Sequence, residues 1–157
     1  LMQRAFDLQS AIASRLEHTA RRLADADTGV ATPPASCVDL RVVGRPRRLP
    51  SELQLSIFRA AQEMLTNVER HARATRARVA LAYAGNVVRL GVRDDGIGLS
   101  PAVCSGEATG HGLRNLRART ARFDGEVDLR APRGGGACVV ATFRIPTEGS
   151  HVHRFLW

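Results

Sequence analysis

Three separated polar and glycine-rich segments, in a fixed order, constrain this 157-residue chain more than any other feature. Glu63 and Asn67 come first, Asp94 to Gly98 (Asp-Asp-Gly-Ile-Gly) follows, and Gly110 to Leu113 (Gly-His-Gly-Leu) comes last. The middle segment has a carboxylate at a strand end and glycines that let backbone approach a ligand such as a base. The last segment has a glycine pair before a helix, whose N-terminus can bind phosphate. Together the segments indicate a pocket for a nucleotide and its metal.

Composition sets the class of protein around this pocket. The length suits one domain, and 44% hydrophobic residues are enough for a core. The net charge is +8, and all 23 basic residues are arginines. These arginines are scattered and lack interleaved aromatic residues that would stack on bases, so no direct binding of nucleic acid is expected.

The cysteines and the hydropathy pattern bear on the compartment. Cys37, Cys104 and Cys138 form no pattern with metal-ligand spacing, which indicates reduced thiols in a cytoplasmic domain. No apolar stretch approaches the roughly 20 residues of a membrane span. We therefore expect no membrane segment within these residues.

Hydrophobic periodicity predicts three helices and five strands. The helices are expected at Ala5 to Asp25, with Gly29 as a stop, at Ser51 to Ala74, and at Leu113 to Gly125; the strands are expected at 38–42, 79–83, 88–92, 127–129 and 138–145. Ser51 and Gln54 have the spacing of a capping box. The order predicts an α+β two-layer sandwich, with a mostly antiparallel sheet and its helices on one face.

Asp94 is the candidate contact for the base. On its predicted strand it shares the parity of Leu90 and Val92, so its side chain points to the core side. A buried ionised carboxylate needs hydrogen-bond donors, and the exocyclic amine of adenine is one. Gly96 and Gly98 would let a purine press against the backbone. Standing alone, the segment also fits a solvated Asp-Asp-Gly turn.

Polar residues border the apolar stripe of the second predicted helix. Asn67 can offer an amide oxygen to Mg²⁺, Glu63 can accept a proton or orient the attacking group, and Arg70 can meet a phosphate oxygen. In isolation, Glu63 and Arg70 fit a solvated helix face better than a site. His71 fits a structural histidine better than a catalytic one.

The segment Gly110-His111-Gly112-Leu113 places flexible backbone before a helix. Free N–H groups and the positive end of the helix dipole can hold a phosphate there. A plain loop-to-helix junction, with His111 as a lid residue, would look the same in isolation. The preceding residues, 99–109, lack a period and are expected to form a mobile segment over the pocket.

Read together, these segments resemble the N, G1 and G2 boxes of the GHKL superfamily. The match is closest to bacterial two-component sensor histidine kinases, and in particular to those paired with response regulators that carry helix-turn-helix output domains. It covers roughly Val38 to Pro146. The chain then divides into an N-terminal helix leading into the domain (1–30), a GHKL ATP-binding catalytic domain (31–146) and a flexible C-terminal tail (147–157), which includes His151 and His153.

The resemblance implies a Bergerat fold that binds ATP and Mg²⁺. Asp94 would hold the adenine amine, Asn67 the Mg²⁺ and the Gly110 to Leu113 segment the phosphates, while Glu63 would polarise the reacting group. The implied activity is transfer of the ATP γ-phosphoryl group to a histidine on a dimerisation and phosphoacceptor domain, of the same or a separate chain. Relay to an aspartate of the response regulator would follow. The implied location is cytoplasmic, within a parent kinase that can itself be membrane-anchored.

Two departures from the family pattern matter. Gly136-Ala137 stands where relatives often have Gly-Thr, so a hydroxyl that assists adenine binding is absent. No His-Asp or His-Glu pair begins a dimerisation helix, because His18 is followed by Thr19. We therefore expect the first helix to belong to the catalytic domain, rather than to end a dimerisation region, and the acceptor histidine to lie elsewhere.

Two other functions stay open at this point. One is a stand-alone GHKL serine kinase of the anti-sigma-factor type. The other is an ATP-gated conformational module like those of gyrase or mismatch-repair ATPases, in which Glu63 would activate water. The lids of such modules are much longer than the segment between Gly98 and Gly110.

Overall fold

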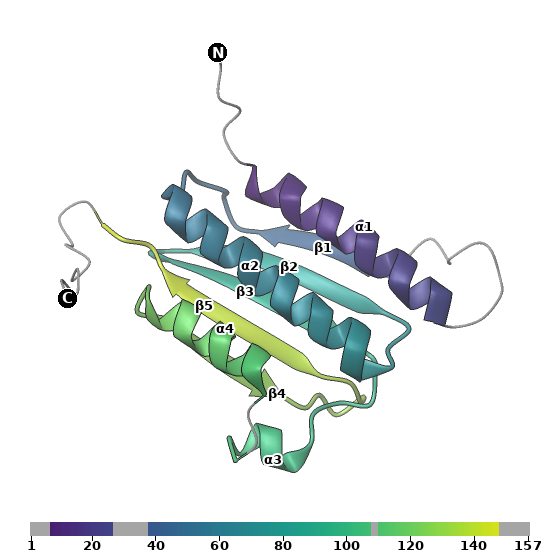
Figure 1. The fold of residues 1–157 in the computed structure, drawn as a ribbon. Helices are drawn as coiled ribbons and strands as arrows, with labels where there is room; N and C mark the ends of the chain where they lie inside the picture. The colour runs from purple at the N-terminus through teal and green to yellow at the C-terminus, as the bar shows by residue number, and fades with distance from the viewer. Residues whose placement is uncertain (1–6, 27–37, 108–109, 148–157) are drawn as a thin grey trace.

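Alternating burial along the strands explains why the three long helices of the described residues pack on one side of the sheet. In the computed structural model, which describes residues 7–26, 38–107 and 110–147, one five-stranded sheet forms the back layer (Figure 1). Its strands follow the order β1-β2-β3-β5-β4, with bounds β1 Val38–Val43, β2 Ala77–Ala84, β3 Val87–Asp94, β4 Glu126–Arg130 and β5 Cys138–Arg144. β1 runs parallel to β2, and the remaining pairs are antiparallel. The predicted fold class is confirmed.

The helical layer covers the apolar face of the sheet (Figure 1). It consists of α1 (Leu8–Ala26), α2 (Ser51–Asn67) continued by the π-helical turn η1 (Val68–Ala72), and α4 (His111–Ala121). The short α3 (Pro101–Cys104) buries none of its residues and lies beyond the β4 edge of the sheet (Figure 1). Leu8, Ile12, Leu16 and Leu23 of α1 belong to the same buried core as α2 and the strands. α1 therefore packs as part of this domain. Within the described ranges, none of the helices combines the length and the apolarity that a membrane span requires.

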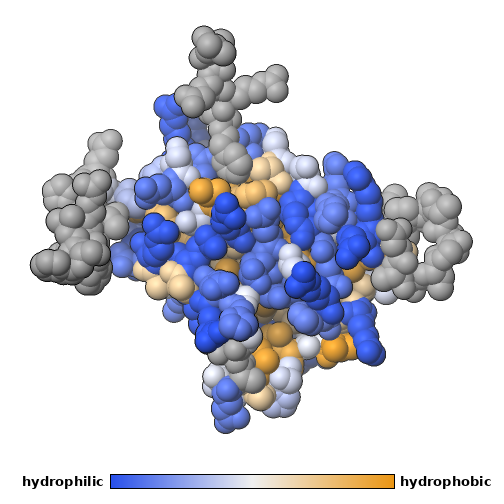
Figure 2. Space-filling view, viewed as in Figure 1, coloured by the Kyte–Doolittle hydropathy of each residue, from blue (hydrophilic) through white to orange (hydrophobic). Residues whose placement is uncertain are grey.

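The surface of the helical face is mostly hydrophilic. Figure 2 shows apolar surface near α3, at the lower end of the view, on a face that is otherwise largely polar. Ile97 is 70% exposed, although large apolar side chains are usually covered. This residue follows β3 at the site described below.

Three sequence predictions need correction. Ser51 makes no capping bond, because Pro50 is the N-cap residue of α2 and Ser51 is already helical. The side chain of Gln54 instead donates to the carbonyl of Leu49 at 2.8 Å. The predicted helix to Ala74 ends earlier and changes its winding at Val68. The segment 99–109 is not without structure throughout, since Ser100 caps α3, whose first residue is Pro101.

Some predictions lie outside the described residues. They concern Ala5, Gly29 and Cys37, and also His151 and His153 of the C-terminal tail. These residues fall in the ranges 1–6, 27–37 and 148–157, which the structure does not describe; residues 108–109 of the predicted mobile segment are also outside the description. The two described cysteines, Cys104 and Cys138, form no disulfide with each other.

Candidate functional site

One pocket of 680 Å³ gathers the three segments singled out in the sequence. This volume lies in the range of small-molecule sites. The candidate residues that line it are Glu63, Asn67, Arg70, Asp94, Gly98, Gly110, His111, Gly112 and Leu113. α2 and η1 form one wall, the end of β3 forms the base, and the start of α4 closes the other side. Gly96, also a candidate, lies behind the wall.

Asp94 occupies the deep end of the pocket. It is the last residue of β3, pairs with Ala77 of β2, and is 7% exposed. Its Oδ1 accepts hydrogen bonds from the N–H groups of Gly96 at 2.9 Å and Ala137 at 3.3 Å. Oδ1 accepts both of these bonds. No donor among the described residues reaches Oδ2, so this oxygen is available to a donor on a ligand. The strand parity of Asp94 predicted this inward orientation.

Burial raises the pKa of Asp94, and the nearby charge of Asp95 acts in the same direction, while the two backbone hydrogen bonds oppose the shift. The fold therefore holds a carboxylate where water stabilises its charge poorly. An N–H donor from a bound base would compensate for this lost hydration. Adenine carries such a donor on its exocyclic amine.

Gly96 serves the wall rather than the ligand. A Cβ at this position would overlap the carbonyl oxygen of Ala72, the last residue of η1. The same carbonyl accepts a bond from the N–H of Ile97 at 2.8 Å. Glycine at this position therefore lets two protein segments meet at the pocket wall, and its φ is not positive. That Gly96 also makes room for a purine stays a prediction.

Gly98 and Gly136 make a second close approach. Gly98 has φ +81°, and its Cβ would lie 3.0 Å from the carbonyl oxygen of Gly136. Gly136 has φ +77°, and its Cβ would overlap the carbonyl oxygen of Asp94. Positive φ is favourable only for glycine here. The neighbouring Ala137 carries no hydroxyl; its N–H donates to Asp94, and the residue lines the pocket.

Glu63 and Asn67 of α2 face the first turn of α4. A Cβ on Gly112 would overlap Oε1 of Glu63 and would lie 3.5 Å from Oδ1 of Asn67. Glycine at this position therefore lets the amide and carboxylate oxygens approach the start of α4. An amide oxygen facing a phosphate site is a suitable single protein ligand for Mg²⁺, which keeps several waters and phosphate oxygens. The positions of Asn67 and Glu63 therefore suit a Mg²⁺ ion bound with phosphate.

The N-terminus of α4 offers free backbone donors. Gly110 is its N-cap residue and supplies no side-chain bond. The first intrahelical bond runs from the N–H of Arg114 to the carbonyl of Gly110 at 3.2 Å. The N–H groups before Arg114 point along the helix axis toward the pocket, where they and the helix dipole favour an anion. His111 is exposed, and its Nδ1 lies 2.7 Å from Nη2 of Arg114.

An apolar bed that the sequence reasoning did not assign completes the pocket. Its members come from α2, β3, α4, β4 and β5, and they are Met64, Val92, Leu116, Leu129 and Val139. The signal for Val92 was its parity with Asp94. The others need the pairing of β4 with β5 and the packing of α2 on α4, which no local pattern shows.

Asp95 is a second residue whose role the sequence reasoning missed. Its Oδ1 accepts the N–H groups of Thr75 at 2.9 Å and Arg76 at 2.8 Å, and its Oδ2 accepts the hydroxyl of Thr75 at 2.8 Å. Asp95 thus ties the end of β3 to the chain that enters β2. It is not among the residues lining the pocket.

We expect Asp95→Asn to lower the free energy of unfolding by about 1 kcal/mol at neutral pH, a small effect because solvent screens this exposed group. Burial acts to raise the pKa of Asp95, but hydrogen bonds from Arg76 and Thr75 hold it below the usual value. A lowered folded-state pKa adds stability above the unfolded value, and this stability is lost as the pH falls through the folded pKa. Urea unfolding at several pH values should show the deficit shrinking in acid. A loss of unfolding free energy that is the same at all pH values would contradict this prediction. Asp39→Asn is the control, because the contact of Asp39 with Arg78 is exposed and 3.8 Å long.

Comparisons with known proteins agree with this geometry. Residues 52–148 match the family described as histidine kinase-, DNA gyrase B-, and HSP90-like ATPase. The sensor histidine kinase LnrJ of Bacillus subtilis (strain 168) is 33% identical over 110 residues, which cover 70% of this chain and 26% of LnrJ. The nitrate/nitrite sensor protein NarX of Escherichia coli (strain K12) is 31% identical over 98 residues, which cover 62% of this chain and 16% of NarX. The chain thus spans about a quarter or less of the length of these relatives.

Solved structures show the same fold. Acinetobacter baumannii histidine kinase AdeS has a TM-score of 0.68 at 16% identity, over 90% of this chain and 66% of the AdeS chain. The histidine kinase domain of the Erythrobacter litoralis EL346 blue-light activated histidine kinase has a TM-score of 0.56 at 20% identity, over 92% of this chain and 77% of that one. The family match, the shared fold and the pocket lead to one conclusion: this chain belongs to the histidine kinase-, DNA gyrase B-, and HSP90-like ATPase family.

Proposed function

We propose that this chain is the ATP-binding catalytic domain of a sensor histidine kinase, which donates the γ-phosphoryl group of ATP to a histidine. The observation that carries the proposal is the buried carboxylate of Asp94, which shares one pocket with the amide of Asn67 and the uncapped start of α4. The names of the relatives favour a histidine as acceptor, since LnrJ and the DegS protein of Brevibacillus brevis are both described as histidine kinases. DegS is 24% identical over 71% of this chain and 28% of its own length.

The geometry supports one orientation of the nucleotide. The exocyclic amine of adenine would donate to Asp94, and the ring would lie on the apolar bed that includes Val92. The triphosphate would then extend toward the N–H groups of α4, with Arg70 of η1 able to contact a phosphate oxygen. Asn67 would hold Mg²⁺, which neutralises phosphate charge when bound.

Phosphoryl transfer from such a complex is mainly a matter of positioning and charge. The bond between the γ-phosphorus and the β–γ bridging oxygen breaks, and a bond to the imidazole nitrogen of the acceptor histidine forms. Glu63 lines the pocket beside Gly112, where its carboxylate would polarise the imidazole as it attacks.

The acceptor histidine would lie on a dimerisation and phosphoacceptor domain, in the same or a separate chain. His18 is an exposed residue of α1 and is followed by Thr19 rather than by an acidic residue, so we do not assign it as the acceptor. Relay would continue to an aspartate of a response regulator with a helix-turn-helix output domain. The proposed location is cytoplasmic.

Replacing Asn67 with alanine should weaken ATP binding about tenfold in the presence of Mg²⁺ and only slightly in EDTA, because the change removes one metal ligand and leaves the adenine contact. Calorimetric titrations of wild type and variant under both conditions measure the difference. Gln62→Ala, which changes a residue of α2 outside the pocket lining, is the control. An equal loss with and without Mg²⁺ would contradict the assignment.

Incubation with γ-labelled ATP tests the proposed reaction. A dimerisation and phosphoacceptor fragment added to the chain should acquire an acid-labile phosphohistidine, and Glu63→Gln should slow labelling with little change in ATP affinity. Acid-stable phosphoserine on a partner protein would instead identify a serine kinase. ATP hydrolysis without labelling of any protein would point to a conformational ATPase.

A further inference from the structure

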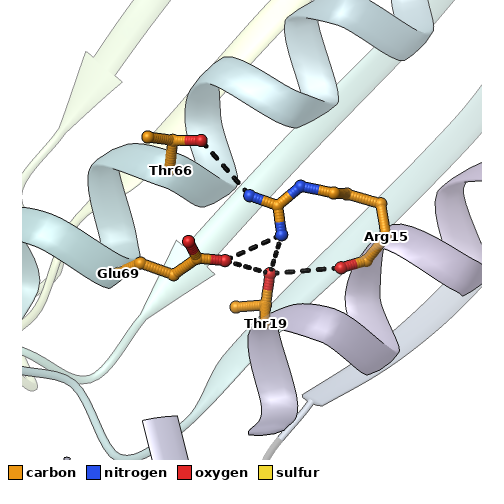
Figure 3. Close-up of polar contacts among 4 residues, drawn as sticks. All are labelled: Arg15, Thr19, Thr66 and Glu69. Atoms are coloured by element: carbon orange, nitrogen blue, oxygen red, sulfur yellow. Dashed lines mark hydrogen bonds and ion pairs between the residues drawn. The ribbon is translucent and has the colours of Figure 1, made fainter. Parts of the chain in front are cut away.

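A polar cluster joins α1 to the turn that forms one wall of the pocket (Figure 3). Nη1 of Arg15 donates to Oε1 of Glu69 at 2.7 Å, and Nη2 donates to Oγ1 of Thr66 at 3.2 Å. The hydroxyl of Thr19 accepts from Arg15 at 2.6 Å and donates to Glu69 at 2.7 Å. One guanidinium from α1 therefore holds two residues, three positions apart, at the junction of α2 and η1.

The cluster is sheltered from water. The side chains of Arg15 and Glu69 are 14% and 10% exposed, and Thr19 is fully buried. The other ion pair of α1, between Glu17 and Arg21, is 3.9 Å long and more than 70% exposed on both sides. Exposed pairs of that kind contribute little, whereas removing one partner of a sheltered pair leaves a charge that water cannot fully solvate.

The two residues that Arg15 holds are each followed in the sequence by a residue of the pocket. Thr66 lines the pocket and precedes Asn67, and Glu69 precedes Arg70, which also lines the pocket. Residues 68–72 form a π-helical turn, a winding that is rare and is frequently found at functional sites. A rotation that carried Glu69 away from α1 would turn Arg70 by the same angle, because the two are adjacent on one rigid turn.

We propose that Arg15 is a positioning residue for the nucleotide pocket: its bonds to Glu69 and Thr66 fix η1, and thereby set where Arg70 stands relative to the phosphates. The inference rests on the proposed function, because it concerns the ATP that the pocket would bind. Arg15 is not among the residues lining the pocket, so it acts through Glu69. α1 thus becomes part of the nucleotide site without touching the nucleotide.

Titration of the full 157-residue chain with ATP and with adenosine tests this inference. Arg15→Met keeps the length and apolar stem of the side chain but removes its bonds. We expect it to weaken ATP binding about tenfold and adenosine binding less than about twofold, because a displaced wall misplaces the phosphate contacts and spares Asp94. Arg15→Lys, which can still reach Glu69, should recover most of the ATP affinity.

Two control variants on α1 separate positioning from stability. Leu16→Ala removes a side chain that is 5% exposed, so it should destabilise the fold through a cavity and yet keep ATP affinity well below its melting temperature. Arg21→Ala removes an exposed arginine and should change neither property. If Arg15→Met fails to fold, Glu69→Gln makes the same test, with an expected loss of ATP affinity of about threefold.

The outcomes decide between the inference and the proposed function. Wild-type ATP affinity in a folded Arg15→Met or Glu69→Gln variant would overturn the inference alone. An equal loss of ATP and adenosine affinity, or a loss in Leu16→Ala as large as that in Arg15→Met, would also overturn it. A wild-type chain that binds no ATP would overturn both.

Discussion

Replacing Asp94 with asparagine is expected to weaken ATP binding by about 10- to 100-fold and to leave the fold intact. Asparagine keeps the shape of the side chain and an oxygen for the N–H groups of Gly96 and Ala137. It replaces Oδ2, the oxygen that would accept the adenine amine, with an NH2 group, which can only donate. Calorimetric titration measures the affinity, and thermal unfolding measures the stability.

The stability of this variant carries its own prediction. Burial raises the pKa of Asp94, so the ionised carboxylate costs free energy in the folded state at neutral pH, and that cost falls as the pH is lowered through the folded pKa. The substituted asparagine side chain carries no such charge, so we expect the variant to be at least as stable as wild type at pH 7.

The Asp94→Asn variant should also lose selectivity for ATP over GTP, because guanine presents a carbonyl where adenine presents its amine.

Asp95→Asn is the matched control for this result. Asp95 is the next residue in the chain, but its carboxylate bonds to Thr75 and Arg76 and does not line the pocket. We expect it to lose stability and to keep ATP affinity, the reverse of Asp94→Asn. Unchanged ATP binding in Asp94→Asn would mean that another group recognises the base.

Gly96→Ala is expected to cost both stability and ATP binding. Its Cβ would overlap the carbonyl oxygen of Ala72, a backbone atom that cannot move without shifting η1. The strain should lower the free energy of unfolding by about 1–3 kcal/mol. Since the N–H of Gly96 also donates to Asp94, the base contact shifts as well, and we expect ATP affinity to fall about tenfold.

Gly134→Ala provides the comparison for Gly96→Ala. A Cβ at Gly134 meets nothing within 4 Å, and its φ is not positive. This variant should match wild type in urea unfolding and in ATP titration. If Gly96→Ala also matched wild type, the close approach of the two segments would not be what shapes the pocket wall.

The strands and the inward side chain of Asp94 could be predicted because burial alternates along β3, and alternation is visible in the sequence. The direction of β1 could not, because its parallel pairing with β2 depends on the long connection through α2. The π-helical turn was hidden because its apolar residues continue the period of α2. Thus local periodicity placed the elements and the antiparallel hairpin of β2 and β3, but not the parallel pairing of β1 or the change of winding at Val68.

The candidate residues of the pocket could be chosen from the sequence, since carboxylate, amide and glycine chemistry is local. The residues that hold these candidates in place could not be predicted from the sequence. Asp95 reaches Thr75 across 20 residues, and Arg15 reaches Glu69 across 54. Gly96 was chosen for a ligand, whereas its neighbour is the carbonyl of Ala72. Such contacts follow from tertiary packing and leave no periodic trace.

A crystal structure of the chain with Mg²⁺ and a non-hydrolysable ATP analogue tests the central claim most directly. The account predicts that the exocyclic amine of adenine donates to Asp94, that the metal meets the amide oxygen of Asn67, and that the phosphates lie at the N-terminus of α4. A nucleotide bound elsewhere on the protein, or adenine turned away from Asp94, would contradict it.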